Sequence, residues 1–190
     1  MRIQACLVGA VLTLATPALA QRAPDAAALI AAQKEALKAF SMMDGVWRGP
    51  AWTDTESGRH EVTQTERIGP FLDGSVKVLE GRGYNGDGSV GFNAFGVLYY
   101  DVRTKKYALR SWAQGSTGDF AFQPTADGYV WEVPAGPNAR IRYTAHITAT
   151  TYHEIGERIV GDGQPVQMFD MNLKRVGDSK WPGEGTIPPR

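Results

Sequence analysis

Cysteine is almost absent from this sequence, and its absence narrows the available chemistry. Among 190 residues there is one cysteine, Cys6, inside an apolar run near the start that has the features of a removable signal. Once that segment is cleaved, the mature chain has no thiol. This excludes disulfides, cysteine nucleophiles and cysteine metal ligands, so stability in an oxidising compartment has to come from the hydrophobic core.

The sequence also lacks an excess of charge of either sign. Its 20 basic residues balance its 20 acidic residues, and the basic residues are scattered along the chain. Proteins that bind nucleic acid or an anionic membrane surface gather basic residues into a patch or a stripe. Neither kind of partner is expected here.

A long hydrophobic run is missing as well. The apolar run from Ile3 to Leu14 has 12 residues, too few to cross roughly 30 Å of hydrocarbon. It follows a positively charged start and precedes small residues at the two positions that determine cleavage. We therefore expect residues 1–20 to be a signal peptide cleaved before Gln21, an exported protein that is periplasmic or secreted, and no membrane anchor.

Histidine is scarce, and its spacing argues against a metal centre. The three histidines, His60, His146 and His153, fall on different expected strands. Strand alternation turns His146 toward solvent and His153 inward, where a lone histidine is more often a hydrogen-bonded core residue than a ligand. Isolated Asp-Gly pairs elsewhere are typical of hairpin turns rather than calcium sites. We assign no metal and no cofactor.

The mature chain opens with one expected amphipathic helix. After Pro24-Asp25, the apolar residues Ile30, Leu37 and Phe40 recur at helical spacing within residues 26–40. Asp25 can cap the first turn of this helix by accepting from exposed backbone N–H groups. The helix and its linker occupy residues 21–44, and the apolar stripe has to cover another element.

From residue 45 the sequence changes to short runs of aromatic and β-branched residues separated by Gly, Asp and Asn turns. Because every connection is short, the strands form an antiparallel meander, and closing it removes two exposed edges. We expect one mainly β domain over residues 45–176: a ten-strand antiparallel up-and-down barrel, capped at one end by the helix and followed by a flexible tail over residues 177–190. The expected strands are 46–54, 59–69, 74–84, 90–101, 105–114, 118–124, 128–134, 139–149, 151–161 and 165–176.

Gly45-Val46-Trp47 opens the first strand directly after the helix, and Arg175 closes the last strand. This resembles the calycin superfamily of lipocalins, fatty-acid-binding proteins and nitrobindin-like barrels, in which a Gly-x-Trp motif and a late basic residue pack together at one barrel end. The resemblance implies that Gly45, Trp47 and Arg175 form this structural signature, with Trp47 buried.

A longer stretch carries a second resemblance. The run over residues 61–84, followed by Phe92-Asn-Ala-Phe-Gly96 and Tyr100-Asp101, is similar to an uncharacterised family of exported bacterial lipocalin-like barrels, a domain of unknown function. The similarity extends over roughly residues 35–178. It implies a fold and a compartment and no chemistry.

Polar residues on otherwise apolar strand faces mark the candidate binding site. Gln64 and Glu66 share one face of the second expected strand, Glu80 lies on the third, and Arg110 and Trp112 share a face of the fifth. A buried, unpaired charge is costly, so we expect Arg110 to hold Glu66 or Glu80 in the empty state and a ligand's acidic head in the bound state. Alternatively, one or two strands face the other way, or the polar groups lie at the rim.

The expected function is non-enzymatic binding of a small, partly apolar or amphipathic molecule, with an acidic head as one option. No catalytic constellation is recognisable, while aromatic residues on nearly all strands suffice to fill the barrel or to line a cavity of a few hundred Å³. A structural or partner-binding barrel is the main alternative. Two further alternatives are haem binding through His153, as in nitrobindin-like barrels, and a hydrolase that uses paired carboxyl groups.

Overall fold

The computed structural model describes residues 25–183. The chain begins with helix α1 (Ala26–Leu37), continues through the 3₁₀ helix η1 (Lys38–Met43) and enters the sheet at Gly45. The signal peptide expected over residues 1–20 and the cleavage site before Gln21 lie outside the described residues, as does the end of the tail, residues 184–190.

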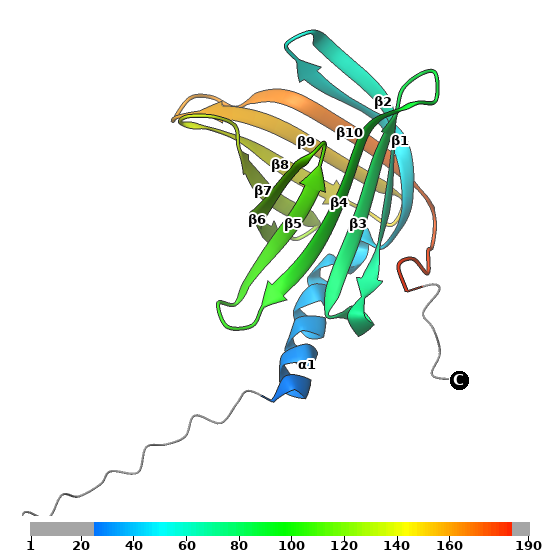
Figure 1. Cartoon of the computed structure of the whole chain (residues 1–190), viewed down its shortest axis with the longest axis vertical. Coiled ribbons are helices and arrows are strands. Elements are labelled where there is room, and N and C mark those ends of the chain that lie inside the picture. The colour runs from blue at the N-terminus through cyan, green and yellow to red at the C-terminus, as the bar shows by residue number, and fades with distance from the viewer. Residues whose placement is uncertain (1–24, 184–190) are drawn as a thin grey trace, which may run out of the picture.

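Within the described part of the chain, ten strands form one sheet, and the 3₁₀ turn η2 (Leu72–Gly74) connects the second strand to the third. Each strand pairs antiparallel with the next, and the last pairs with the first, so the sheet closes into a barrel (Figure 1). This confirms the expected ten-strand up-and-down barrel, and every strand begins and ends within two residues of expectation. The strands are β1 (Gly45–Thr55), β2 (Gly58–Phe71), β3 (Val76–Tyr84), β4 (Val90–Asp101), β5 (Lys106–Ala113), β6 (Ser116–Pro124), β7 (Gly128–Pro134), β8 (Ala139–Ile147), β9 (Thr151–Val160) and β10 (Val166–Gly177).

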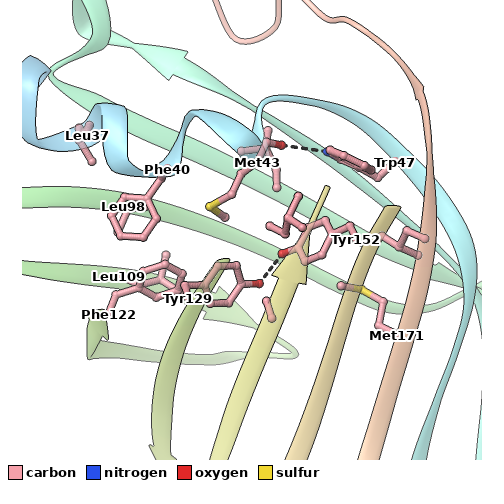
Figure 2. Packing of buried hydrophobic residues seen from close by; sticks show 14 of the residues in the cluster. Leu37, Phe40, Met43, Trp47, Leu98, Leu109, Phe122, Tyr129, Tyr152 and Met171 are labelled. Atoms are coloured by element: carbon pink, nitrogen blue, oxygen red, sulfur yellow. Dashed lines mark hydrogen bonds between the residues drawn. The ribbon is translucent and has the colours of Figure 1, made fainter. Parts of the chain in front are cut away.

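Helix α1 lies at one end of the barrel, the lower end in Figure 1. Asp25 caps it by accepting a hydrogen bond from the backbone N–H of Ala27 at 3.0 Å. The expected helix over residues 26–40 changes to 3₁₀ geometry after Leu37, which turns Phe40 and Met43 into the barrel, where both are fully buried (Figure 2). The helix therefore closes this end of the barrel with its own side chains.

Trp47 lies at the centre of the closed end and is fully buried. Its indole Nε1–H donates to the backbone carbonyl of Met43 at 2.9 Å, which ties β1 to the 3₁₀ turn that precedes it (Figure 2). Its ring meets the Tyr152 ring edge-on, with the ring centres 5.7 Å apart. Trp47 thus joins the helical cap to the inner faces of β1 and β9.

Gly45 and Arg175 complete this arrangement on the same strand pair. The Arg175 guanidinium lies 5.5 Å from the centre of the Trp47 ring and donates to the backbone carbonyl of Asp44 at 2.9 Å. Gly45 has a φ of +131°, and a Cβ there would stand 2.8 Å from Arg175 Nη2. Only glycine combines this backbone conformation with so close an approach. The structure therefore brings Gly45, Trp47 and Arg175 together.

We predict that Trp47→Ala lowers the free energy of unfolding by about 3 to 5 kcal/mol, because it empties a large fully enclosed site. Trp112→Ala is the matched control, because Trp112 is 41% exposed on the barrel wall and should cost much less. Urea denaturation followed by circular dichroism measures both. Equal losses for the two variants would contradict the structural role of Trp47.

A buried ion pair lies beside this layer. Lys77 of β3 is only 3% exposed, and its ammonium group donates to the carboxylate of Asp44 in the turn between η1 and β1. Burial raises the pKa of Asp44 and lowers the pKa of Lys77, and each partner opposes that change only in part. Burial is the largest cause of both shifts, so we expect the pair to fix position more than it adds stability.

We predict that Asp44→Ala lowers the free energy of unfolding by about 3 to 5 kcal/mol, because it strands the Lys77 ammonium in the core. Adding Lys77→Met should restore most of that loss, since Met fills a similar volume without a charge. The measurement is urea denaturation of the single and double variants. A double variant no more stable than Asp44→Ala would show that the stranded charge is not the cause.

One seam of the barrel wall is weaker than the others. β6 and β7 are joined by three residue pairs, from Phe122↔Trp131 to Pro124↔Tyr129, the fewest between any two neighbouring strands described. Beyond Trp131 the two strands keep their other neighbours but no longer pair with each other. A hollow on the outer face lies over this seam, lined in part by Gln123, Trp131 and Arg142.

The described residues after β10, 178–183, form no strand but pack on the barrel. The Trp181 ring lies 4.3 Å from the guanidinium of Arg67, and a Cβ on Gly69 would stand 2.2 Å from the Trp181 carbonyl oxygen. Residues 178–183 therefore cover part of the outer face of β2. Between residues 25 and 183, no helix combines the length and the apolar character that a membrane span requires.

Candidate functional site

The barrel encloses a cavity of about 540 Å³. Its inner end rests on core residues of the helix-capped end, including Leu109, Phe122 and Met171. At the opposite end it reaches Thr55 and Ser116, beside the short β1–β2 and β5–β6 turns. The interior is thus packed at one end and hollow at the other.

Aromatic rings form most of the cavity wall. Trp131 of β7 stacks on Tyr143 of β8 with ring centres 4.7 Å apart, and Tyr143 meets Phe169 of β10 edge-on at 5.6 Å. These contacts cross strand boundaries, so each ring is held by its neighbours as well as by its own backbone. The aromatic side chains that face the cavity are Phe92, Phe120, Phe122, Tyr129, Trp131, Tyr143, Tyr152 and Phe169.

Glu66 projects from β2 into the cavity and accepts a hydrogen bond through Oε1 from Gln64 Nε2 at 2.7 Å. Directly across the ladder is Gly81 of β3, where a Cβ would stand 2.7 Å from Glu66 Oε1. The missing side chain makes room for the carboxyl group. Burial raises the pKa of Glu66 to about 8, an effect that the nearby Glu154 and Glu80 charges increase and the Gln64 hydrogen bond reduces.

Glu154 of β9 is the second carboxyl group in the cavity and is only 7% exposed. Its Oε1 accepts from the Trp131 indole Nε1–H at 2.9 Å, so one edge of the aromatic wall also positions an acid. Burial raises the pKa of Glu154 to about 7, and the hydrogen bonds from Trp131 and Tyr129 only partly oppose this.

Two tyrosine hydroxyls lie beside these acids. Tyr129 and Tyr152 are buried on β7 and β9, and their hydroxyl groups bond to each other (Figure 2). Burial raises the pKa of both hydroxyls well above the usual value, and the charges of Glu154 and Glu66 add to the rise. Glu66, Glu154 and the tyrosine pair therefore form one polar layer at the inner end of the cavity.

Of the five residues expected at the binding site, the structure places Gln64 and Glu66 in the cavity. The expectation for Glu80 is wrong: it lies on the outer face, where Arg67 Nε donates to it at 3.0 Å and Arg82 Nη2 at 2.7 Å. Inward on β3 are Leu79 and Gly81. Glu80 shares its face with Val78, which is only 4% exposed on the outer side of the barrel, beside the segment that covers β2. A buried apolar neighbour on this strand therefore does not mark the inner face.

The expected inward positions of Arg110 and Trp112 are also wrong. Arg110 lies on the outer face of β5, where it pairs with the exposed Asp119 at 3.0 Å. Trp112 lies on the same face, 6.0 Å from the Phe95 ring, while Leu109 and Ser111 line the cavity. Arg110 therefore cannot hold Glu66 or a ligand inside the barrel. On β5 the inner and outer faces are the reverse of the expected ones. Trp112 favoured the wrong face because aromatic residues are usually buried.

The histidines divide differently from expectation. His146 is exposed and bonds to Asp127 at 2.8 Å, as its alternation predicted, but His153 also faces outward and bonds to Asp170 at 3.1 Å. Glu154 takes the inward position instead. Only His60 lines the cavity, near its open end. Between residues 25 and 183, no group of three or more His, Cys, Asp and Glu side chains is arranged to hold a metal ion.

Sequence reasoning missed Glu154 and Tyr143 as members of the site. Tyr152, Glu154 and Gly156 alternate on β9, but His153 and Ile155 form an equally plausible inner face. One weak signal was present: Gly156 leaves the space that Tyr143 and Phe169 occupy, since a Cβ there would stand 2.8 Å from the Tyr143 ring. A glycine within a strand indicates close approach by a neighbour.

Solved structures share this fold at low sequence identity. Rv2717c from M. tuberculosis superposes with a TM-score of 0.55 at 13% identity, over 74% of this chain and 96% of that one. The S-type phycobiliprotein lyase CPES from Guillardia theta has a TM-score of 0.48 at 13% identity, over 83% of this chain and 100% of that one. No protein-family model and no curated protein matches the sequence. The likeness to Rv2717c supports the closed antiparallel barrel fold.

We predict that the protein loses stability as the pH rises from about 5 to about 8. Unfolded, Glu66 and Glu154 ionise near the ordinary pKa of 4.5, whereas in the folded protein they hold their protons to about 8 and about 7. The folded state thus binds more protons in this range, and each carboxyl contributes a slope of at most about 1.4 kcal/mol per pH unit.

Urea denaturation at half-unit pH steps measures this slope. The double variant Glu66→Gln/Glu154→Gln should flatten it, because neither amide titrates. Asp119→Asn, which removes an exposed acid on the outer face, is the control and should leave the slope unchanged. A slope that persists in the double variant would assign the effect to other groups.

Proposed function

We propose that this protein is an exported, non-enzymatic binder of small, partly apolar molecules. The observation that carries the proposal is the cavity of about 540 Å³ with eight aromatic side chains facing it and two acids at its inner end. Small-molecule sites are typically concave, mostly apolar and about 300 to 1,000 Å³ in volume, with a few polar groups that orient the ligand. The export half of the proposal rests on the features of residues 1–20 alone.

The cavity is organised before any ligand arrives. Trp131, Tyr143 and Phe169 contact one another, and the Trp131 indole is fixed by its hydrogen bond to Glu154. Side chains that are already ordered lose little conformational freedom on binding, so more of the contact energy contributes to affinity. This supports binding over a barrel whose only role is structural.

The alternatives have less support in the described residues. A carboxyl-based hydrolase needs one acid and one ionised partner, yet burial raises the pKa of both Glu66 and Glu154. Haem binding as in nitrobindin-like barrels requires an inward-facing His153, but His153 faces outward. A partner-binding barrel has Phe95 and Trp112 on its outer wall, and two neighbouring rings make only a small apolar patch.

We predict that the neutral fluorescent probe N-phenyl-1-naphthylamine binds at a single saturable site in the barrel. Ser111→Trp, which places a large ring inside the cavity, should weaken the probe's affinity at least tenfold. Arg110→Trp adds the same ring one residue away on the outer face and should leave the affinity unchanged. Fluorescence titration measures all three proteins, and circular dichroism shows whether the barrel is retained.

Ala94→Phe, which also fills the cavity, is a second blocking variant if Ser111→Trp does not fold. Equal probe binding by the folded blocking variants and by Arg110→Trp would contradict binding in the barrel. Native mass spectrometry of the protein purified from its own host is the complementary measurement, because it can show a ligand that was retained through purification.

A further inference from the structure

Within the described residues, the acidic groups in the cavity wall have no permanently charged counter-ion beside them. Among the residues that line the cavity are the acids Glu66 and Glu154, with His60 near the open end, and there is no lysine or arginine. Lys77 of β3 is buried, but its ammonium group is paired with Asp44 at the closed end of the barrel. An anionic ligand would therefore meet two acids and no cation. This disfavours a ligand with an acidic head group, which the expected inward position of Arg110 had favoured.

Both acids keep hydrogen-bonding capacity after their protein contacts are counted. Glu66 accepts from the Gln64 amide, and Glu154 accepts from the Trp131 indole and the Tyr129 hydroxyl; all three donors are neutral. Neither acid has an ion pair within the described residues, whereas the outward Glu80 has two arginines. A ligand that brings positive charge would supply the missing partner.

Aromatic faces adjoin the same position. Trp131 donates to Glu154 and stacks on Tyr143, and the Tyr129 ring packs against Phe122 with ring centres 4.5 Å apart. A cation over such rings is attracted by their negative faces, and the attraction increases when water is excluded. An aromatic wall beside an unpaired acid is the arrangement that recognises ammonium groups.

We propose that the preferred ligand is an organic cation: an ammonium group on an apolar body, with the charged head beside Glu66 and Glu154 and against the Trp131 and Tyr143 rings. This inference rests on the proposed small-molecule binding and names the class of ligand. The apolar body would fill the remainder of the cavity toward Phe92 and Phe120, which belong to its wall.

Binding of a cation should be coupled to proton release. The titratable groups facing the two acids are Tyr129 of β7, Tyr143 of β8 and Tyr152 of β9, with His60 of β2 farther toward the opening. Burial raises the pKa of all three tyrosines, so the carboxyl groups are the ones that give up a proton near neutral pH. A positive ligand favours their ionised form, and its affinity rises with pH between about 6 and 8.

Four probes that share one naphthalene body test this inference by calorimetric titration of the wild-type chain at pH 7.5. They are 1-naphthylmethylamine, its trimethylammonium analogue, the neutral 1-naphthylmethanol and the anionic 1-naphthoate. Both cations should bind at least tenfold more tightly than the alcohol, which corresponds to about 1.4 kcal/mol, and naphthoate should bind most weakly. Titration of the amine in two buffers of different ionisation enthalpy should show proton release.

Glu154→Gln and Glu66→Gln locate the preference, because an amide can still accept the neutral hydrogen bond at each position. Each should reduce the preference for cations over the alcohol at least fivefold and leave the affinity for the alcohol within twofold. Asp119→Asn on the outer wall controls for net charge and should change neither quantity.

The outcomes separate the two proposals. If the alcohol or naphthoate binds as tightly as the cations, or if Asp119→Asn acts like the cavity variants, the inference about cations is wrong while small-molecule binding stands. If none of the four probes binds and N-phenyl-1-naphthylamine does not bind either, the proposed function itself is wrong, and this inference with it.

Discussion

Pairing of β1 with β10 is the constraint on which the rest of this structure depends. It joins residues near the two ends of the domain, such as Trp47 and Arg175, and removes the two open edges that a ten-strand meander would have. Only a closed sheet gives every strand an inner face shielded from water. Closure produces both the packed layer around Trp47 and the hollow beyond it. At one end the side chains of the helix fill the barrel, whereas at the other end there are too few side chains to fill it.

Between the packed layer and the hollow lies a polar layer built from hydrogen-bonded neighbours. Gln64 donates a hydrogen bond to Glu66, Trp131 donates one to Glu154, and the hydroxyl groups of Tyr129 and Tyr152 bond to each other. Buried polar groups are tolerated when they are satisfied, and a satisfied network also fixes the orientation of its members. Burial raises the pKa of both acids, so each can donate as well as accept while it holds its proton. The inner end of the cavity therefore offers both donors and acceptors of hydrogen bonds.

Sequence reasoning predicted the barrel well and the site only in part, for a physical reason. Turn residues and strand propensities are local, so strand bounds and the meander could be inferred, and Gly45, Trp47 and Arg175 matched a known pattern. Which face of a strand points inward depends on what covers the other face. Val78 is buried outside the barrel, beside the segment that carries Trp181, and Trp112 is half-exposed on the outer wall. Apolar residues on an outer face therefore misplaced Glu80 and Arg110, while Gln64 and Glu66, on a strand with a clearer alternation, were placed correctly.

The short ladder between β6 and β7 determines where the barrel can widen most easily. Widening the barrel at any other seam would break backbone hydrogen bonds along most of a strand, whereas beyond Trp131 these two strands have none between them to break. The circumference is therefore least fixed where Trp131 forms part of both the cavity and the outer hollow. Any widening of the barrel should therefore begin at this seam, beside Trp131.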